Sequence, residues 1–230
     1  MLEFFESISL LPLVVTFSAF LFGGWVQKKT KLAICNPLLI AILIVLALML
    51  LTGFAPGVYQ AGMEKFGWLL TPATVCLALP LYQKLKVLKN HLSAILAGVV
   101  CGVLVSLAFI LLCCKLFALD RQMTVSLLPK SITTAIALAL TENMGGMAAL
   151  TTVAITITGI GGNLAGSGLC KLLGITHPIA QGVSLGTASH VIGTARANEM
   201  DPLAGAVSSL SLAVAGLLTA VLFPIVCIFA

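Results

Sequence analysis

Charged residues are scarce in this chain. Lys, Arg, Asp and Glu together make up 8% of its 230 residues, whereas soluble domains carry roughly 25%. Five stretches lack them altogether: residues 7–27, 32–63, 92–114, 143–170 and 202–230. Each is long enough to cross a bilayer as a helix, which takes about 20 residues. The scarcity excludes an ordinary soluble domain and predicts an all-α, polytopic, multi-pass helical membrane protein lying in the lipid bilayer.

Sequence patterns for metal binding, nucleotide binding and hydrolysis are also lacking. The seven cysteines include no C-x-x-C pair. The glycine-rich stretch "GIGGNLAGSG" (159–168) has no Gly-Lys-Ser/Thr ending, so it is not a phosphate loop. Its glycines are instead typical of close helix packing in membranes. No nucleophile, base and acid set is visible. We therefore expect no metal, no cofactor and no enzymatic activity.

The net charge of +5 comes from basic residues gathered in short loops, "QKKTK" (27–31) and "QKLKVLKNH" (83–91). This arrangement is typical of cytoplasmic loops under the positive-inside rule. It gives no reason to expect nucleic acid as a partner.

The apolar segments are joined by short loops without a linker, which predicts a single integral membrane domain over residues 1–230. We expect seven or eight hydrophobic segments, including broken or re-entrant half-helices. They lie near residues 8–27, 33–53, 66–83, 92–117, 127–141, 146–170, 178–198 and 203–229.

Two of these segments look interrupted. Residues 67–86 contain Pro72 and Pro80, and a proline tends to start, kink or break a helix. Residues 126–146 hold only eleven uncharged residues between Lys130 and Glu142, which suits a half-helix capped by Ser126. A shift of 57 positions aligns Pro72 with Pro129 and Gly102 with Gly159. The alternatives are chance, in so apolar a chain, and an inverted repeat of the transporter kind.

The stretch "GTASHVIGTARANE" (186–199) concentrates polar residues in an apolar chain. On a helical wheel, Thr187, Ser189, His190, Thr194 and Arg196 fall on one half. Because lipid cannot satisfy such groups, this half is expected to face a cavity or a packed interface.

Each candidate site residue has a functional and a structural interpretation. Arg196 either grips a carboxylate with two parallel hydrogen bonds or pairs with Glu199 or Asp201 near a helix end. His190 either relays a proton or packs between helices.

The hydroxyls of Ser131, Thr133 and Thr134 either complete an anion site at a helix N-terminus or bond to their own helix. The neighbouring Lys130 either steers anions or lies at the membrane interface. Asn143 and Asn163 could line a site, although a turn role and a packing role are the safer interpretations.

Several motifs together resemble those of the LrgB/CidB family of bacterial membrane proteins. They are "NPLLIAI", "LPKSITT", "GGMAALT", "GTASHVIGTARA" and "GAVSSLS", and the resemblance runs from about residue 36 to the end. The family pattern commonly reads T-T-P-I-A where this chain has "TTAIA", so Ala135 stands at the place of a proline.

The resemblance implies a bacterial inner (cytoplasmic) membrane protein that acts alongside a small LrgA-like membrane partner. Relatives are described as antiholin/holin-like regulators of murein hydrolase export, and also as carriers of pyruvate, glycolate and glycerate. The plant plastid glycolate/glycerate translocator resembles an LrgA-like half fused to an LrgB-like half.

Our hypothesis from the sequence is a secondary transporter of small monocarboxylates, with proton coupling as an option. Its substrate site would contain Ser131, Thr133, Thr134, Asn143, Asn163, Thr187, Ser189, His190, Thr194 and Arg196. The rival is a holin-like or antiholin-like oligomer that regulates lysis. The sequence leaves open the substrate, the coupling ion, homo-oligomerisation and the number of full crossings.

Overall fold

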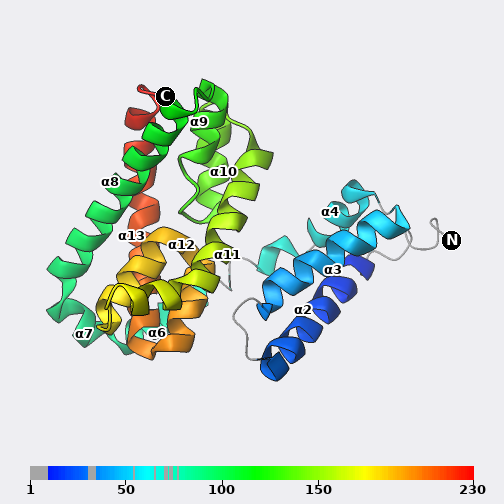
Figure 1. Ribbon diagram of the computed structural model, residues 1–230, viewed down its shortest axis with the longest axis horizontal. Coiled ribbons are helices and arrows are strands. Elements are labelled where there is room, and N and C mark those ends of the chain that lie inside the picture. Colours follow the sequence, from blue (N-terminus) through cyan, green and yellow to red (C-terminus); the bar gives the residue numbers. More distant parts are fainter. Residues whose placement is uncertain are drawn as a thin grey trace. The chain divides into compact units, whose positions relative to one another are not determined.

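The structure is a computed structural model that describes residues 10–30, 35–53, 55–64, 66–69, 72, 75–76 and 78–230. Every regular element in that part of the chain is a helix (Figure 1). The chain divides into two compact units, Met1–Cys76 and Leu77–Ala230. The all-α fold predicted from the sequence is confirmed for the described residues.

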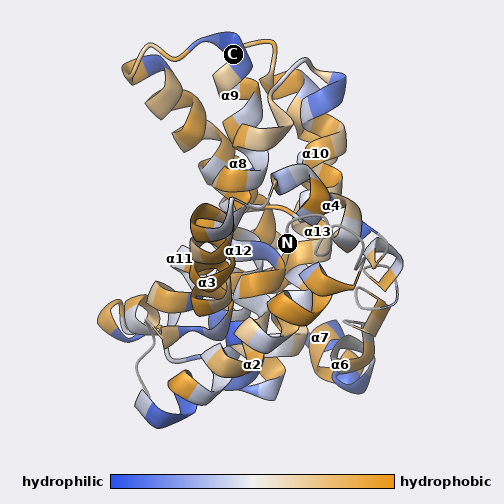
Figure 2. Ribbon diagram, turned by 90° about the vertical axis from the view of Figure 1, so that its right-hand side faces the viewer, coloured by the Kyte–Doolittle hydropathy of each residue, from blue (hydrophilic) through white to orange (hydrophobic). Residues whose placement is uncertain are grey.

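In the described part of the chain, four helices are long and apolar enough to cross a membrane. They are α2 (Leu11–Thr30), α8 (Leu92–Leu116), α11 (Ala148–Leu172) and α13 (Pro202–Val226). Hydrophobic residues run along the length of the helices, and hydrophilic ones gather mainly at helix ends and turns (Figure 2). These helices are those of a membrane protein. The count of seven or eight segments, and the re-entrant path of the shorter ones, stay predictions.

The N-terminal unit is built on α2 and a shorter apolar helix, α3 (Pro37–Thr52). Asn36 begins α3 by accepting a hydrogen bond from the backbone N–H of Leu38 at 2.8 Å, and Gly53 ends it at φ 66°. The helix α4 (Pro56–Glu64) and the short turn η2 (Gly67–Leu69) follow. Of the segment predicted at 66–83, residues 70, 71, 73, 74 and 77 lie outside the described residues.

The C-terminal unit has its core along one stripe of α8. Ile95, Val99, Val103 and Leu107 are spaced four residues apart and are buried, as befits one helix face. On the other side of the same helix Val105, Phe109 and Leu112 are exposed. A helix that is apolar all round fits a place between protein and lipid, with the exposed face turned to the acyl chains.

Small residues let α12 (Pro178–Met200) approach α13 very closely. A Cβ added at Gly182 would overlap the backbone carbonyl of Ala204, and one added at Gly186 would overlap that of Ser208. Close backbone approach of this kind is how membrane helices gain packing contacts in the absence of a hydrophobic drive between them. It fixes the first half of α12 firmly against α13.

A half-helix was predicted at 127–141 with Ser126 as its cap, and its predicted start is wrong. A separate helix α9 (Arg121–Leu127) comes first, and its cap is Asp120, which accepts from the backbone N–H of Met123 at 2.7 Å. Helix α10 (Thr134–Asn143) begins only after a turn over 128–133. Ser126 lies inside α9, where its hydroxyl donates to the carbonyl of Gln122 and accepts from the backbone N–H of Met147.

A short-helix and long-helix pattern occurs twice in the C-terminal unit. Helices α6 (Ala78–Gln83) and α7 (Leu85–Asn90) precede the 25-residue α8, and α10 precedes the 25-residue α11. Helices α8 and α11 run in opposite directions (Figure 1). This pattern has the direction that an inverted repeat requires, and the repeat itself stays a prediction.

Candidate functional site

Helix α12 is broken in the middle of the polar motif. Ser189 has φ −132° and ψ 19°, and His190 has φ 44° and ψ −137°, while the residues on either side are helical. A positive φ with this ψ is a region that glycine favours and that costs other residues of order 1–3 kcal/mol. A non-glycine residue stays there only when its surroundings hold it, so the break calls for a structural cause.

The two halves of α12 turn back across each other at this break. A Cβ added at Gly193 would lie 2.6 Å from the carbonyl oxygen of Leu185. In a straight helix these two positions would be about 12 Å apart along the axis. The absence of a side chain at Gly193 therefore lets the second half pack against the end of the first.

Glycines on α11 leave space for the side chains of Ser189 and His190 at the break in α12. A Cβ at Gly159 would lie 2.6 Å from Cε1 of His190, and one at Gly162 would overlap the hydroxyl of Ser189. The imidazole of His190 is buried, and its Nε2 lies 3.0 Å from the carbonyl oxygen of Ile155 in a hydrogen bond. The side chain of His190 thus anchors the strained backbone to α11.

Several polar groups around the second half of α12 are satisfied inside the bundle. The Thr194 hydroxyl donates to the carbonyl of His190 at 2.9 Å, and its oxygen lies 2.8 Å from the hydroxyl of Ser208. Asn163 donates from Nδ2 to the carbonyl of Ile192 at 3.1 Å. These bonds stabilise the break and leave little polar capacity on this side for a ligand.

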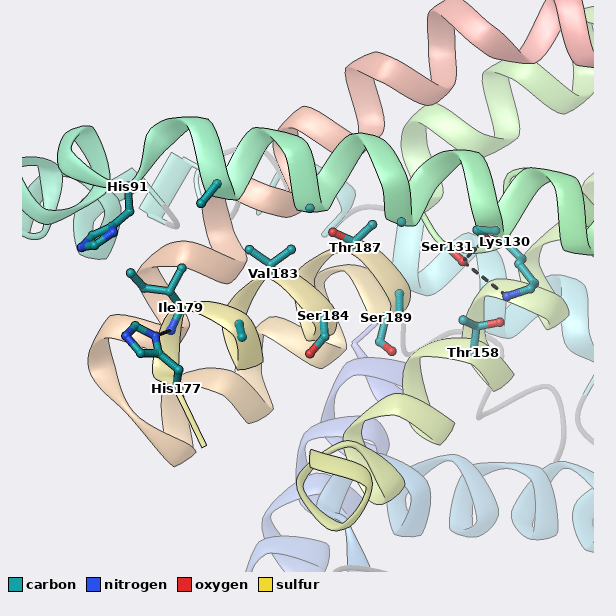
Figure 3. A pocket seen from close by; sticks show the side chains of 16 residues that line it. His91, Lys130, Ser131, Thr158, His177, Ile179, Val183, Ser184, Thr187 and Ser189 are labelled. Atoms are coloured by element: carbon teal, nitrogen blue, oxygen red, sulfur yellow. Dashed lines mark hydrogen bonds between the residues drawn. The ribbon is translucent and has the colours of Figure 1, made fainter. Parts of the chain in front are cut away.

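A pocket of about 790 Å³ lies on the other side of α12, between its first half and α8 (Figure 3). Along α8 it follows Ala94, Gly98, Gly102 and Ser106, a stripe with four-residue spacing. From His91 to Ser106 the stripe extends about 22 Å along the helix axis. The pocket therefore reaches from the beginning of α8 past its middle. Its size is in the range of small-molecule sites.

The two ends of the pocket differ in character. His91 and His177 lie together at one end and are exposed. Lys130, Ser131 and Thr158 lie together at the other end, and Ser131 is buried there (Figure 3). The pocket is thus exposed at the beginning of α8 and along its α12 wall, where Ser184 and Ala188 are exposed, and its most polar end is the one around Lys130.

Lys130 and several hydroxyls make up this polar end. The ammonium of Lys130 donates to the Ser131 hydroxyl at 3.3 Å, and Ser131 is 3.5 Å from the hydroxyl of Ser106. Thr187 lines the pocket nearer its middle (Figure 3), is 6% exposed, and its hydroxyl has no hydrogen-bond partner among the described residues. An unpaired buried hydroxyl costs about 1–3 kcal/mol, and a bound acceptor would remove that cost.

The structure brings three of the ten residues predicted for a substrate site to this pocket: Ser131, Thr187 and Ser189. The others are not among its lining residues. Thr133 and Thr134 are at the start of α10 and Asn143 is at its end. Asn163, His190 and Thr194 are buried on the side of the break that faces α11 and α13.

Arg196 lies away from the pocket, in the second half of α12. Its guanidinium donates to Oε2 of Glu199 at 2.7 Å, which is an ion pair, and to the Ser167 hydroxyl at 3.0 Å. This is the structural interpretation given above for Arg196. Its role as a carboxylate ligand stays a prediction from the sequence, without a place in this pocket.

Sequence reasoning did not include Lys130, Ser106 or Thr158 among the site residues. A signal for Lys130 was present, because it is the one charged residue between Arg121 and Glu142. Ser106 and Thr158 gave no such signal, since single hydroxyls are common in membrane helices and bond to their own backbone.

Comparison with known families gives one match. The LrgB-like family model matches residues 16–229, nearly the whole chain. No solved structure matches the chain. The chain therefore belongs to the LrgB-like family, and the resemblance seen in its motifs is confirmed.

Proposed function

We propose that this chain is a secondary transporter of small monocarboxylates and that the Lys130 end of the pocket is its substrate site. We further propose that it works in the cytoplasmic membrane with an LrgA-type partner and that it is not an enzyme. One observation carries the proposal: an ammonium without a carboxylate partner among the described residues lies beside a buried hydroxyl, that of Ser131, in the wall of a pocket.

The chemistry of this end suits a carboxylate. The Lys130 ammonium is a point charge with three donors, one of which is used by Ser131. A carboxylate has two oxygens and only accepts hydrogen bonds, so it would accept from the Lys130 ammonium and from the neighbouring Ser131 hydroxyl and neutralise the charge.

The packing beyond Ser131 favours a carrier over a pore. A separate void of only about 10 Å³ lies there, and it is lined by buried apolar side chains, including those of Val103, Leu107 and Leu128. A holin-like pore needs a continuous wet path, whereas a carrier exposes its site to one side at a time.

The open end is expected to face the cytoplasm. Lys84, Lys86 and Lys89 precede His91 directly in the chain, and basic loops of this kind are cytoplasmic under the positive-inside rule. In this interpretation the pocket is the inward-facing vestibule of the carrier.

Uptake into proteoliposomes tests the proposal. The purified chain would be reconstituted alone and together with an LrgA-type protein, and the uptake of labelled pyruvate and glycolate would be measured with and without a pH gradient. Labelled sucrose serves as the control solute. We expect saturable uptake that other short carboxylates inhibit and no entry of sucrose.

Two results would contradict the proposal in different ways. Absence of flux for every short carboxylate, under all of these conditions, would remove the transporter function. Entry of sucrose together with carboxylates, without saturation, would instead support the holin-like alternative.

A further inference from the structure

Within the described part of the chain, Lys130 differs from Arg196, another cation of the C-terminal unit, in having no carboxylate as a counter-ion. Arg196 is paired with Glu199, whereas no carboxylate that the structure describes forms an ion pair with Lys130. The ammonium has one hydrogen bond within the described residues, to the Ser131 hydroxyl at 3.3 Å. Among the described residues, the ammonium of Lys130 is therefore contacted by a hydroxyl and paired with no carboxylate.

As far as the structure describes the chain, the surroundings of Lys130 contain one other titratable side chain, that of His190. Helix α8 contributes Ser106 and α11 contributes Thr158, neither of which titrates. Helix α13 carries no titratable residue at all. From α12 the imidazole of His190 interacts electrostatically with Lys130. His91 and His177 lie at the opposite end of the pocket (Figure 3).

A lone ammonium in such a place holds its proton weakly. Low dielectric favours the neutral amine, because the charged form loses hydration and gains no counter-ion. A carboxylate bound beside the same nitrogen favours the ammonium, because the ion pair replaces the lost hydration. Binding of the carboxylate and binding of a proton to Lys130 thus strengthen each other, and the effect is reciprocal.

Resting on the proposed function, we propose that Lys130 couples carboxylate transport to a proton, so that the chain is an electroneutral proton–monocarboxylate symporter. The loaded carrier holds the pair of Lys130 ammonium and substrate carboxylate. On the inner side the carboxylate leaves and the proton leaves with it to water. The empty carrier returns with a neutral amine, and the net transfer is one carboxylate with one proton.

His190 is less suited to this role, although it is the titratable group predicted from the sequence. Its Nε2 is engaged by the Ile155 carbonyl, and its ring fills the space beside Gly159. It is 4% exposed and is not among the residues that line the pocket. A proton on His190 therefore has no direct contact with a substrate held at Lys130.

The variant Lys130→Arg separates binding from coupling. Arginine keeps the positive charge but does not release its proton in proteins. In proteoliposomes we expect Lys130→Arg to exchange labelled for unlabelled pyruvate, because the loaded state is retained. We expect the same variant to lose accumulation driven by a pH gradient, because the empty carrier stays charged. Lys89→Arg, on the exposed surface of α7, is the matched control and should keep both activities.

A second measurement does not depend on the variant. Addition of pyruvate to the purified wild-type protein in weakly buffered alkaline solution should cause proton uptake of up to one per chain, and addition of sucrose should cause none. Accumulation by Lys130→Arg at the wild-type level, or pyruvate binding to the wild type without proton uptake, would overturn the coupling role alone. Wild-type protein that moves no carboxylate in either assay would overturn the proposed function and this role with it.

Discussion

Nε2 of His190 lies 3.0 Å from the carbonyl oxygen of Ile155, and this bond joins the break in α12 to the neighbouring helix α11. The backbone of His190 has φ 44°, a conformation that a side chain disfavours. The imidazole thus compensates, through its contact with α11, for the strain that its own backbone carries. From the sequence, His190 was expected either to relay a proton or to pack between helices. In the structure its side chain anchors the break in α12 to α11.

The anchoring role predicts different effects for two substitutions at this position. His190→Ala removes the bond to Ile155 and leaves a side chain at a positive φ. His190→Gly removes the same bond but relieves the backbone strain. We expect His190→Gly to be more stable than His190→Ala by about 1–2 kcal/mol. Unfolding of the purified variants in denaturing mixed micelles measures this difference.

Transport by the same two variants distinguishes anchoring from proton relay. Both lack an imidazole, so a relay predicts that both lose gradient-driven pyruvate accumulation equally. Anchoring predicts that His190→Gly keeps more of this activity than His190→Ala, because the break retains its geometry. Equal loss in two variants of unequal stability would contradict the anchoring role.

The glycines of α11 provide a prediction with an internal control. A Cβ at Gly162 would overlap the Ser189 hydroxyl, whereas a Cβ at Gly161 would meet nothing within 4 Å. We expect Gly162→Ala to lower the free energy of unfolding by about 1–3 kcal/mol, the usual cost of overpacking. Gly161→Ala should leave stability unchanged or raise it by up to about 1 kcal/mol, since alanine is the better helix former. Equal stability of the two variants would show that the α11–α12 contact is looser than described.

The long helices could be predicted from the sequence because their signal is local. Residues 92–114 and 202–230 carry no charge, and α8 and α13 occupy them almost entirely. The break of α12 could not be predicted in this way. Positions 189 and 190 hold neither proline nor glycine, and the polar stripe of 186–199 suits an unbroken helix equally well. The causes of the break are Gly193 on the same helix and the glycines of α11, which meet it only in the folded chain.

The candidate site could be predicted in part for a similar reason. Polarity in an apolar chain identified Ser131, Thr187 and Ser189, which do line the pocket. The same criterion also selected Thr194, whose hydroxyl is already satisfied by His190 and Ser208. The sequence shows that a polar side chain in the membrane needs a hydrogen-bond partner. It does not show whether that partner is a protein atom or a ligand.

Thr187 and Thr194 should therefore respond oppositely to substitution by valine. The hydroxyl of Thr187 is buried without a partner, so Thr187→Val should stabilise the ligand-free protein by about 1 kcal/mol. Thr194→Val removes two hydrogen bonds and should destabilise it by about 1–3 kcal/mol. A destabilised Thr187→Val would show that this hydroxyl has a partner in the membrane.

Lys130 and Arg196 give the sharpest test of where the substrate charge is neutralised. Both are cations of the C-terminal unit, but only Lys130 lines the pocket, and Arg196 is bound to Glu199 and Ser167. We expect Lys130→Gln to raise the KM for pyruvate by at least about tenfold, since a charged hydrogen bond contributes about 1.5–3 kcal/mol. Arg196→Gln should change the KM little and lower stability by less than about 1 kcal/mol, as for a partly exposed ion pair. The opposite ranking of the two variants in pyruvate uptake would move the substrate site to the second half of α12, where the sequence motif "GTARANE" had suggested it. It would also make the Lys130 pocket an access route, because the substrate would then reach Arg196 past the broken helix.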